Sequence, residues 1–214
     1  LLAEAPEPRW APTALLKARR SLPERLLARW VWWRLPEPCE RRKRLSDVIL
    51  EKPEIVRWHK AEETRRLLSM MNEPNLATLR RAQRARRRIV GTLYKRTRVE
   101  DGAKVQRAEV RFDEIAGCLR TPAGGSSRQT ILVVHGHSVR SRLLDAREAA
   151  ALMGLSSSYQ LPRRYNEAYH LVGDGVVVDV VRHLARHLFE PLVNDGAPAS
   201  PRETGRVATR SAAA

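Results

Sequence analysis

The stretch that decides the fold is Val105-Gln106-Arg107-Ala108-Glu109-Val110-Arg111-Phe112. From Ala108 on, every second side chain is apolar, and the side chains between them are charged. A period of two residues is typical of a β-strand that buries one face. Ile89–Arg98 also has the composition of a strand, and Asp101-Gly102 between the two suits a tight turn. The sequence therefore predicts a β-hairpin here.

Three more strands are predicted after the hairpin, at Ile115–Leu119, Thr130–Val134 and Val139–Leu143. The last two flank His135-Gly136, which has the composition of a turn. The segment from Pro122 to Arg128 contains Pro, Gly and Ser and is predicted to be a loop. The region from 89 to 143 is therefore expected to be rich in β-structure.

Helices are predicted on both sides of this region. Four precede it, at Ala14–Arg20, Pro23–Trp30, Ala61–Met71 and Leu76–Arg88, with a connector over residues 46–58. After it, Asp145 and Glu148 form an acidic capping box, and Gly154 ends that helix. A loop then leads to Gly173-Asp174-Gly175 and an amphipathic helix through Phe189. The apolar face of that helix comprises Val177, Val180, Val181, Leu184 and Leu188.

The composition points to a polyanionic partner. The chain of 214 residues has 40 Lys and Arg, 34 of them Arg, against 24 Asp and Glu, which gives a net charge of +16. Nucleic acid is the first candidate for that charge and an anionic membrane the second. The chain has two cysteines and no signal peptide or membrane-spanning run, so we expect a cytoplasmic protein without disulfides. Because it opens at Leu1, we expect a cut or incomplete chain.

Two motifs resemble the last two conserved motifs of bacterial DNA cytosine-5 methyltransferases. The first runs from Arg142 through Asp145-Ala146-Arg147-Glu148 to Gly154, with Tyr159 after it. The second is Tyr169-His170-Leu171-Val172-Gly173-Asp174-Gly175-Val176. Upstream, residues 115–121 and Gly124-Gly125 resemble the end of the family's target-recognition domain. The sequence departs from the family pattern at Asp174, where Asn is usual, and at Asp179, where many relatives have Pro.

The resemblance implies an α+β chain: a small β-rich target-recognition domain with flanking helices, completing a Rossmann-like methyltransferase whose amino-terminal half is absent. It divides the chain into a basic helical lead-in (1–88), a β-rich target-recognition region (89–141), the motif region with its C-terminal helix (142–192) and a disordered tail (193–214). The implied substrate is double-stranded DNA, with the target cytosine flipped out of the helix. The implied methyl donor of the complete enzyme is S-adenosylmethionine.

Residue by residue, the resemblance suggests two sites. Backbone amides around Gly173, Asp174, Gly175 and Val176 would face the cofactor at a helix start. The alternative is a plain tight turn. DNA contacts are expected from Arg120, Thr121, Gly124, Gly125, Ser126, Ser127 and Arg128, where glycines allow close approach and the other side chains supply donors. For residues 124–128 the alternative is a solvated hairpin loop.

No catalytic residue is expected in this chain. The family's nucleophile is a Cys in a Pro-Cys motif, which forms a covalent bond to cytosine, and its partner is a Glu-Asn-Val motif. Pro38-Cys39-Glu40 lies in a segment rich in Pro and Arg, without a preceding buried strand and without that partner. We therefore interpret Cys39 as structural or incidental. No metal is expected either, because His183 and His187 have helical spacing but no third ligand.

These expectations define the function and its alternatives. The chain would be the C-terminal portion of a DNA cytosine-5 methyltransferase of a bacterial restriction-modification system, and inactive alone. It would contribute target recognition and part of the cofactor side. One alternative is a truncated remnant or non-enzymatic basic DNA-binding module. Another is a subunit of a split enzyme, active with a separate amino-terminal catalytic half.

Overall fold

The computed structural model describes residues 2–3, 7–41, 43–119 and 128–196. It divides into two compact units: Cys39–Val181, and Leu1–Pro38 together with Arg182–Ala214. The mixture of helices and antiparallel sheets confirms the expected α+β class. The boundaries predicted at 88/89 and 141/142 fall inside the first unit and do not separate compact bodies. The division of the chain by its motifs therefore remains a prediction.

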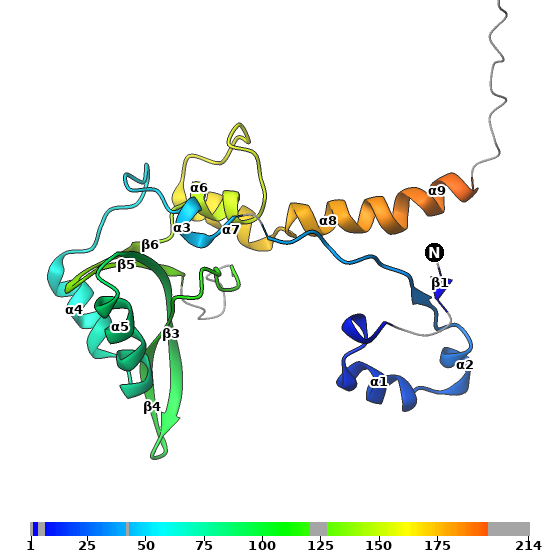
Figure 1. Ribbon diagram of the computed structural model, residues 1–214, viewed down its shortest axis with the longest axis horizontal. Coiled ribbons are helices and arrows are strands. Elements are labelled where there is room, and N and C mark those ends of the chain that lie inside the picture. The colour runs from blue at the N-terminus through cyan, green and yellow to red at the C-terminus, as the bar shows by residue number, and fades with distance from the viewer. Residues whose placement is uncertain (1, 4–6, 42, 120–127, 197–214) are drawn as a thin grey trace, which may run out of the picture. The chain divides into compact units, whose positions relative to one another are not determined.

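The larger unit is built on a four-stranded antiparallel sheet of order β4-β3-β5-β6 (Figure 1). The predicted hairpin is confirmed: β3 pairs with β4 from Thr92↔Arg111 to Glu100↔Ala103. Asp101 and Gly102 both have positive φ, 49° and 79°, as a tight hairpin turn requires. The bounds of the strands are β3 Arg88–Glu100, β4 Ala103–Arg111, β5 Thr130–His135 and β6 Ser138–Leu143.

One face of the sheet is covered by α4 (Ala61–Ser69) and α5 (Glu73–Arg84). The N-cap of α5 is Asn72, whose side chain accepts a hydrogen bond from the Asn75 amide. The core on this face contains Leu67, Met71, Leu79, Ala82, Leu93, Ala108, Leu132 and Val134. The apolar side of the predicted alternation, which includes Ala108, is therefore the side that packs against the helices.

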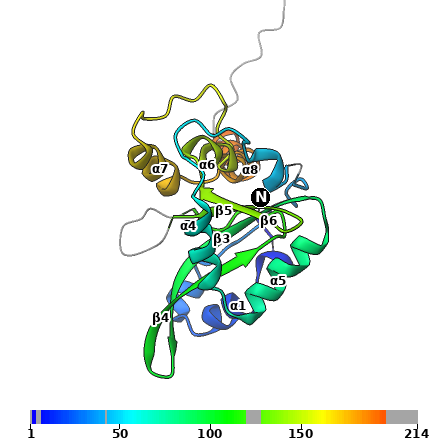
Figure 2. The same cartoon turned by 90° about the vertical axis from the view of Figure 1, so that its left-hand side faces the viewer.

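The opposite face is covered by three other helices (Figure 2, where α6 and α7 lie above β5 and β6, and α5 below). They are α3 (Leu45–Val48), α6 (Ala146–Leu152) and α7 (Tyr165–Asp174). Successive strand residues point to opposite faces, so Ile131 joins this core while Leu132 joins the other. This core contains Leu45, Ile49, Val90, Ile131, Leu144, Ala149, Ala150, Met153, Tyr169 and Val172.

Four details of the predicted secondary structure were wrong. Residues 115–119 are not a strand, because Glu114 has φ 59° and the Glu114 carbonyl accepts from the Leu45 amide. Helix α5 ends at Arg84, because Arg86 is left-handed (φ 50°), and β3 begins at Arg88. Helix α3 overlaps the start of the expected connector, and α7 occupies the end of the expected loop and continues through Asp174. Both helices exist because one side of each packs into the core.

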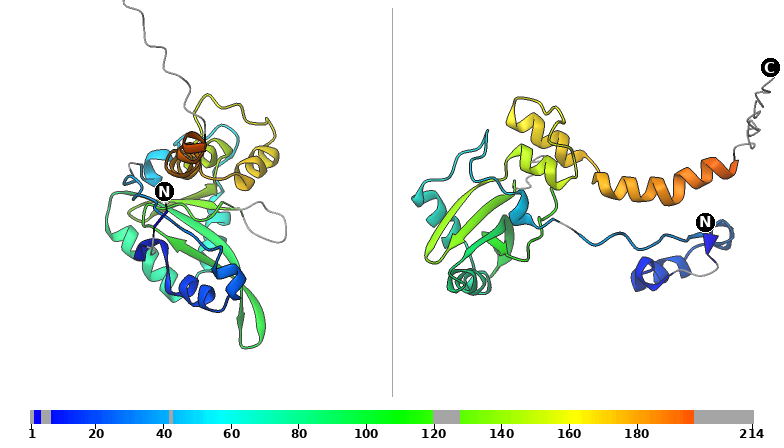
Figure 3. Two further views of the ribbon diagram at one scale, coloured as in Figure 1. Left: turned by 90° about the vertical axis from the view of Figure 1, so that its right-hand side faces the viewer. Right: turned by 45° about the horizontal axis from the view of Figure 1, so that its top comes forward.

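The smaller unit contains short elements and the C-terminal helices. Arg19 lies over the rings of Trp30 and Trp32, 6.0 and 5.5 Å from their centres. Its elements are β1 (Leu2–Ala3), paired with β2 (Trp32–Trp33), the 3₁₀ turn Pro8–Trp10, α1 (Thr13–Arg20) and α2 (Glu24–Leu27). Figure 3 shows in orange the run from α8 (Val178–Leu184), which begins in the larger unit, through a π-helical turn (Ala185–Phe189) to α9 (Glu190–Gly196).

One expectation about this C-terminal run needs correction. Residues 193–196 are helical, whereas the expected disordered tail began at 193; residues 197–214 lie outside the described part of the chain. Part of the apolar face of the predicted helix is in solvent, since Val180 and Val181 are 49% and 46% exposed. None of the helices in the described ranges has the length and apolar content needed to cross a bilayer.

Candidate functional site

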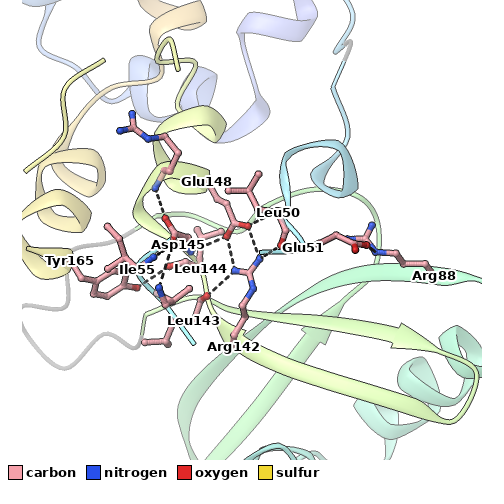
Figure 4. A network of polar contacts seen from close by, with 12 residues as sticks. Leu50, Glu51, Ile55, Arg88, Arg142, Leu143, Leu144, Asp145, Glu148 and Tyr165 are labelled. Carbon is pink, nitrogen blue, oxygen red and sulfur yellow. Dashed lines mark hydrogen bonds and ion pairs between the residues drawn. The ribbon is translucent and has the colours of Figure 1, made fainter. Parts of the chain in front are cut away.

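A buried ion pair joins the end of the sheet to helix α6. Arg142 on β6 donates from Nη2 to Oε1 of Glu148 at 2.6 Å and from Nη1 to Oε2 at 2.7 Å (Figure 4). Both side chains are fully buried. A guanidinium and a carboxylate that meet in this two-bond geometry also fix each other's orientation. The predicted capping box is confirmed as well, because the Asp145 amide donates to Glu148 Oε2 at 2.9 Å.

The carboxylates of Glu148 and Asp145 also accept hydrogen bonds from a segment about ninety to a hundred residues earlier in the sequence. Glu148 Oε1 accepts from the Leu50 amide at 2.7 Å, and Arg142 Nη2 donates to the Leu50 carbonyl at 2.8 Å. Asp145 Oδ2 accepts from the amides of Ile55 and Val56 at 3.1 and 3.4 Å (Figure 4). The first of the two motifs is therefore a structural clasp that positions residues 50–56 on the sheet.

Most residues predicted to contact DNA lie outside the described part of the chain. They are Arg120, Thr121, Gly124, Gly125, Ser126 and Ser127. Arg128 is described and half-buried: its guanidinium lies 5.3 Å from the centre of the Tyr165 ring and donates to Asn166 at 2.5 Å. Arg128 Nε is buried without a hydrogen-bond partner. Arg128 therefore holds the start of β5 against α7.

Both flanks of residues 120–127 are fixed by tyrosines. The Tyr94 hydroxyl donates to the Cys118 carbonyl at 2.8 Å and also contacts the Gln129 side chain. The Gln129 amide lies 3.4 Å from the hydroxyl of Tyr169, and Gln129 is fully buried. Burial raises the pKa of Tyr165 and Tyr169 above the usual value of 10, so both hydroxyls stay protonated and can act as donors. Tyr94 thus links residue 118 to residue 129.

The second motif does not form a helix start. Gly173 and Asp174 are the last two residues of α7, Gly175 is its C-cap, and α8 begins at Val178. The expectation that amides at a helix N-terminus face a ligand was therefore wrong for Gly173 and Asp174, because their amides belong to the hydrogen-bonded end of a helix. This helix had not been predicted.

Gly175 and Val176 instead line a small apolar pocket of about 240 Å³. The Val178 amide donates to the Met153 carbonyl at 2.9 Å, which ties the end of α6 to the start of α8. The remaining wall of the pocket consists of Met153, Leu155, Tyr159, Leu171 and Val172. The two motifs thus build one pocket together, and its lining is suited to the apolar edge of a ligand.

Comparison with known proteins places this chain in a family. A family model for the C-5 cytosine-specific DNA methylases matches residues 23–190, which is most of the chain. The chain belongs to this family. A search of curated proteins finds no match. DNA is the substrate on which DNA methylases act, and the family generally uses S-adenosylmethionine.

In this methylase chain the pocket fits only part of S-adenosylmethionine. Its apolar wall and Tyr159 suit the flat face of an adenine ring. No carboxylate among the described lining residues is available for the ribose hydroxyls. Gly175 and Val176 remain candidates for contact with the cofactor, whereas Gly173 and Asp174 lie at the end of α7 and do not line this pocket.

Other candidate residues of the methylase chain are placed as follows. Cys39 and Cys118 are both free and exposed. The rings of His183 and His187 lie 4.6 Å apart, and the described residues contain no group of three or more potential metal ligands. Sequence reasoning missed Tyr94 and the Tyr165–Tyr169 pair. The spacing of Tyr165 and Tyr169, four residues apart, was a signal for one face of a helix.

Proposed function

We propose that this methylase-family chain recognises target DNA and forms one side of the cofactor pocket in methyl transfer to cytosine C5. In this proposal it is the C-terminal portion of the enzyme. The observation that carries it is the shared pocket of the two motifs, closed by the Val178–Met153 hydrogen bond and supported by the Arg142–Glu148 ion pair. We also propose a bacterial, cytoplasmic restriction-modification context, which rests on the resemblance of the motifs alone.

Target recognition is assigned to residues 120–128. The support is the set of hydrogen bonds made by Tyr94, Gln129 and Arg128 on the two sides of this segment, since a recognition segment needs a scaffold to place its donors. Arg120 would contact a base edge or a phosphate, Gly124 and Gly125 would allow close approach, and Thr121, Ser126 and Ser127 would supply further donors. Arg128 is assigned a positioning role because its guanidinium already contacts Tyr165 and Asn166.

The cofactor, S-adenosylmethionine, would supply the methyl group. The chain's own part is to cover one side of it with Gly175 and Val176 and to exclude water there. Among the described residues no buried strand precedes Cys39, because β2 just before it has two residues and neither is buried, which supports the interpretation that the nucleophile is not Cys39. The methyl transfer itself would then depend on a catalytic half carrying Pro-Cys and Glu-Asn-Val.

An exposed apolar surface supports the existence of such a partner. Within the larger unit, Leu171, Val176, Val180 and Val181 are between 45% and 66% exposed, all at or after the second motif. A group of large apolar side chains in solvent is typical of an interaction surface. We propose that the catalytic half covers this surface, whether it is part of the same polypeptide or a separate subunit.

The test is co-expression with an amino-terminal fragment of a methylase that carries both catalytic motifs, followed by size exclusion and an assay with labelled S-adenosylmethionine. The proposal predicts no label transfer by the chain alone and transfer to cytosine C5 by a stable complex. An absent or inactive complex would favour the remnant or the non-enzymatic DNA-binding module. Label transferred by the chain alone, and lost on Cys39→Ser, would show that Cys39 is the nucleophile.

A further inference from the structure

A second pocket, of about 500 Å³, lies beside the edge strand β6, and neither motif forms it. It is lined by residues of the segment 51–58 and by Arg140. The clasp described above fixes this segment through Leu50, Ile55 and Val56. The segment that lines the pocket is therefore held in place by these hydrogen bonds.

The lining of this pocket is strongly cationic. Lys52, Arg57 and Arg140 all border it, and within the described chain none of the three has an ion pair. Its one carboxylate, Glu51, faces Arg88 at 3.6 Å (Figure 4). Three unpaired cations around one cavity repel each other, and a bound anion would relieve that repulsion.

Trp58 orients one of these cations. The guanidinium carbon of Arg140 lies 3.9 Å from the centre of the Trp58 ring, and that of the buried Arg142 lies 4.9 Å from it. Trp58 is itself fixed, because it forms a β-bridge with Arg142 and the His59 amide donates to the Ser141 carbonyl at 2.9 Å. A guanidinium stacked on an aromatic ring keeps its N–H edge available for a phosphate.

We propose that Lys52, Arg57 and Arg140 form a phosphate-binding groove that holds the DNA backbone. This inference rests on the proposed function. DNA is favoured over a free nucleotide because the pocket lies beside a sheet edge and its one carboxylate side chain, the group best suited to the hydroxyls of a free ribose, faces Arg88. Contacts to phosphates set the position of a protein on DNA without reading its sequence.

The first experiment measures affinity for duplex DNA between about 50 and about 200 mM salt. Each phosphate contact contributes a slope of about −0.9 in log K against log salt. Arg140→Gln should reduce the slope by about one such unit, equally for all DNA sequences, and Lys52→Gln with Arg57→Gln should reduce it further. The matched control is Arg65→Gln on α4, which removes the same charge from an exposed side chain that has no ion pair within the described residues.

Trp58→Leu separates orientation from charge. This change leaves all three cations in place. The stacking role would be supported if Trp58→Leu lost about as much DNA affinity as Arg140→Gln and if combining the two changes caused no further loss. Circular dichroism verifies the fold, because Trp58 is partly buried. Equal slopes for Arg140→Gln and Arg65→Gln, with DNA binding otherwise intact, would overturn the groove and leave the proposed function standing.

Two further outcomes are decisive. If the unaltered chain does not bind DNA at all, both the groove and the proposed function are wrong. Inorganic pyrophosphate is the second probe, observed through the indole NMR signal of Trp58, which Trp58→Leu identifies. A shift with pyrophosphate but none with duplex DNA would show that the pocket binds a free phosphate compound and would overturn DNA as its occupant.

Discussion

Arg142 and Glu148 lie six residues apart and form a two-bond ion pair in which neither side chain is accessible to solvent. The pair also holds Leu50, so it links β6, α6 and an earlier segment of the chain. A buried pair of this kind is costly to break, because the remaining charge stays in a medium where water cannot solvate it.

We therefore expect Glu148→Ala to lower the free energy of unfolding by about 3–5 kcal/mol. The matched control is Glu167→Ala, whose partner Arg164 is 3.4 Å away on the surface. That change should cost at most about 1 kcal/mol. Urea denaturation of both variants measures the difference. Equal, small losses would show that the clasp does not stabilise the fold.

Tyr165 gives a prediction about alkaline pH. Burial raises its pKa above the usual value of 10, and its hydroxyl donates to the Leu144 carbonyl at 2.9 Å. Because the pKa of Tyr165 is higher in the folded than in the unfolded chain, its neutral hydroxyl contributes to the free energy of unfolding. This contribution is fully present below pH 10 and is lost as the pH rises beyond it. We expect the unfolding free energy of the unaltered chain to fall more steeply above pH 10 than that of Tyr165→Phe. Denaturation of both proteins at pH 8 and at pH 11 measures this. Equal losses of unfolding free energy between the two pH values would contradict the prediction.

Arg120 and Arg87 are predicted to differ in how they affect DNA binding. Arg120→Ala should reduce the discrimination between DNA sequences, by about 1–3 kcal/mol if its contact is a two-bond pair with guanine. Arg87→Ala removes an exposed cation after α5 and should lower affinity for all sequences alike. Selection from a random DNA library with each variant gives both profiles. Indistinguishable profiles would show that Arg120 is not a recognition residue.

Val180 tests the proposed surface for the catalytic half. Val180→Lys places a charge on a residue that is 49% exposed, so the chain should fold normally but lose the complex with the catalytic fragment. Val99→Lys, at a residue 70% exposed on β3, is the control and should leave the complex intact. Size exclusion of the co-expressed pair is the measurement. A complex that survives Val180→Lys would place the interface elsewhere.

Asp174 is the departure from the family pattern that is simplest to test. It lies in the last turn of α7, where a negative charge is unfavourable next to the partial negative charge of the helix C-terminus. We expect Asp174→Asn to stabilise the chain slightly, by about 0.3–1 kcal/mol, and to raise the activity of the complex. Asp174→Ala is the control, since it removes the charge without restoring the amide. Equal activity of the two variants would show that the amide itself has no role.

Several features were determined by the sequence alone because they depend on neighbours a few residues apart. Alternation and Asp101-Gly102 predicted the β3–β4 hairpin, and Asp145 with Glu148 predicted the start of α6. Such signals are local: a turn needs two residues with positive φ, and a cap needs a carboxylate three residues from an amide. The net charge of +16 and the order of the two motifs were also readable without coordinates.

Only the tertiary structure decided what depends on distant partners. Ile115–Leu119 was predicted to be a strand, but Glu114 turns the chain and its backbone pairs with Leu45 instead. Residues 173–175 were expected at a helix start, whereas burial of Tyr169 and Val172 makes the preceding segment a helix that ends there. The Arg140–Trp58 stack joins residues more than eighty positions apart. No local pattern records such contacts, because burial and pairing are set by the chain segments that the fold brings together.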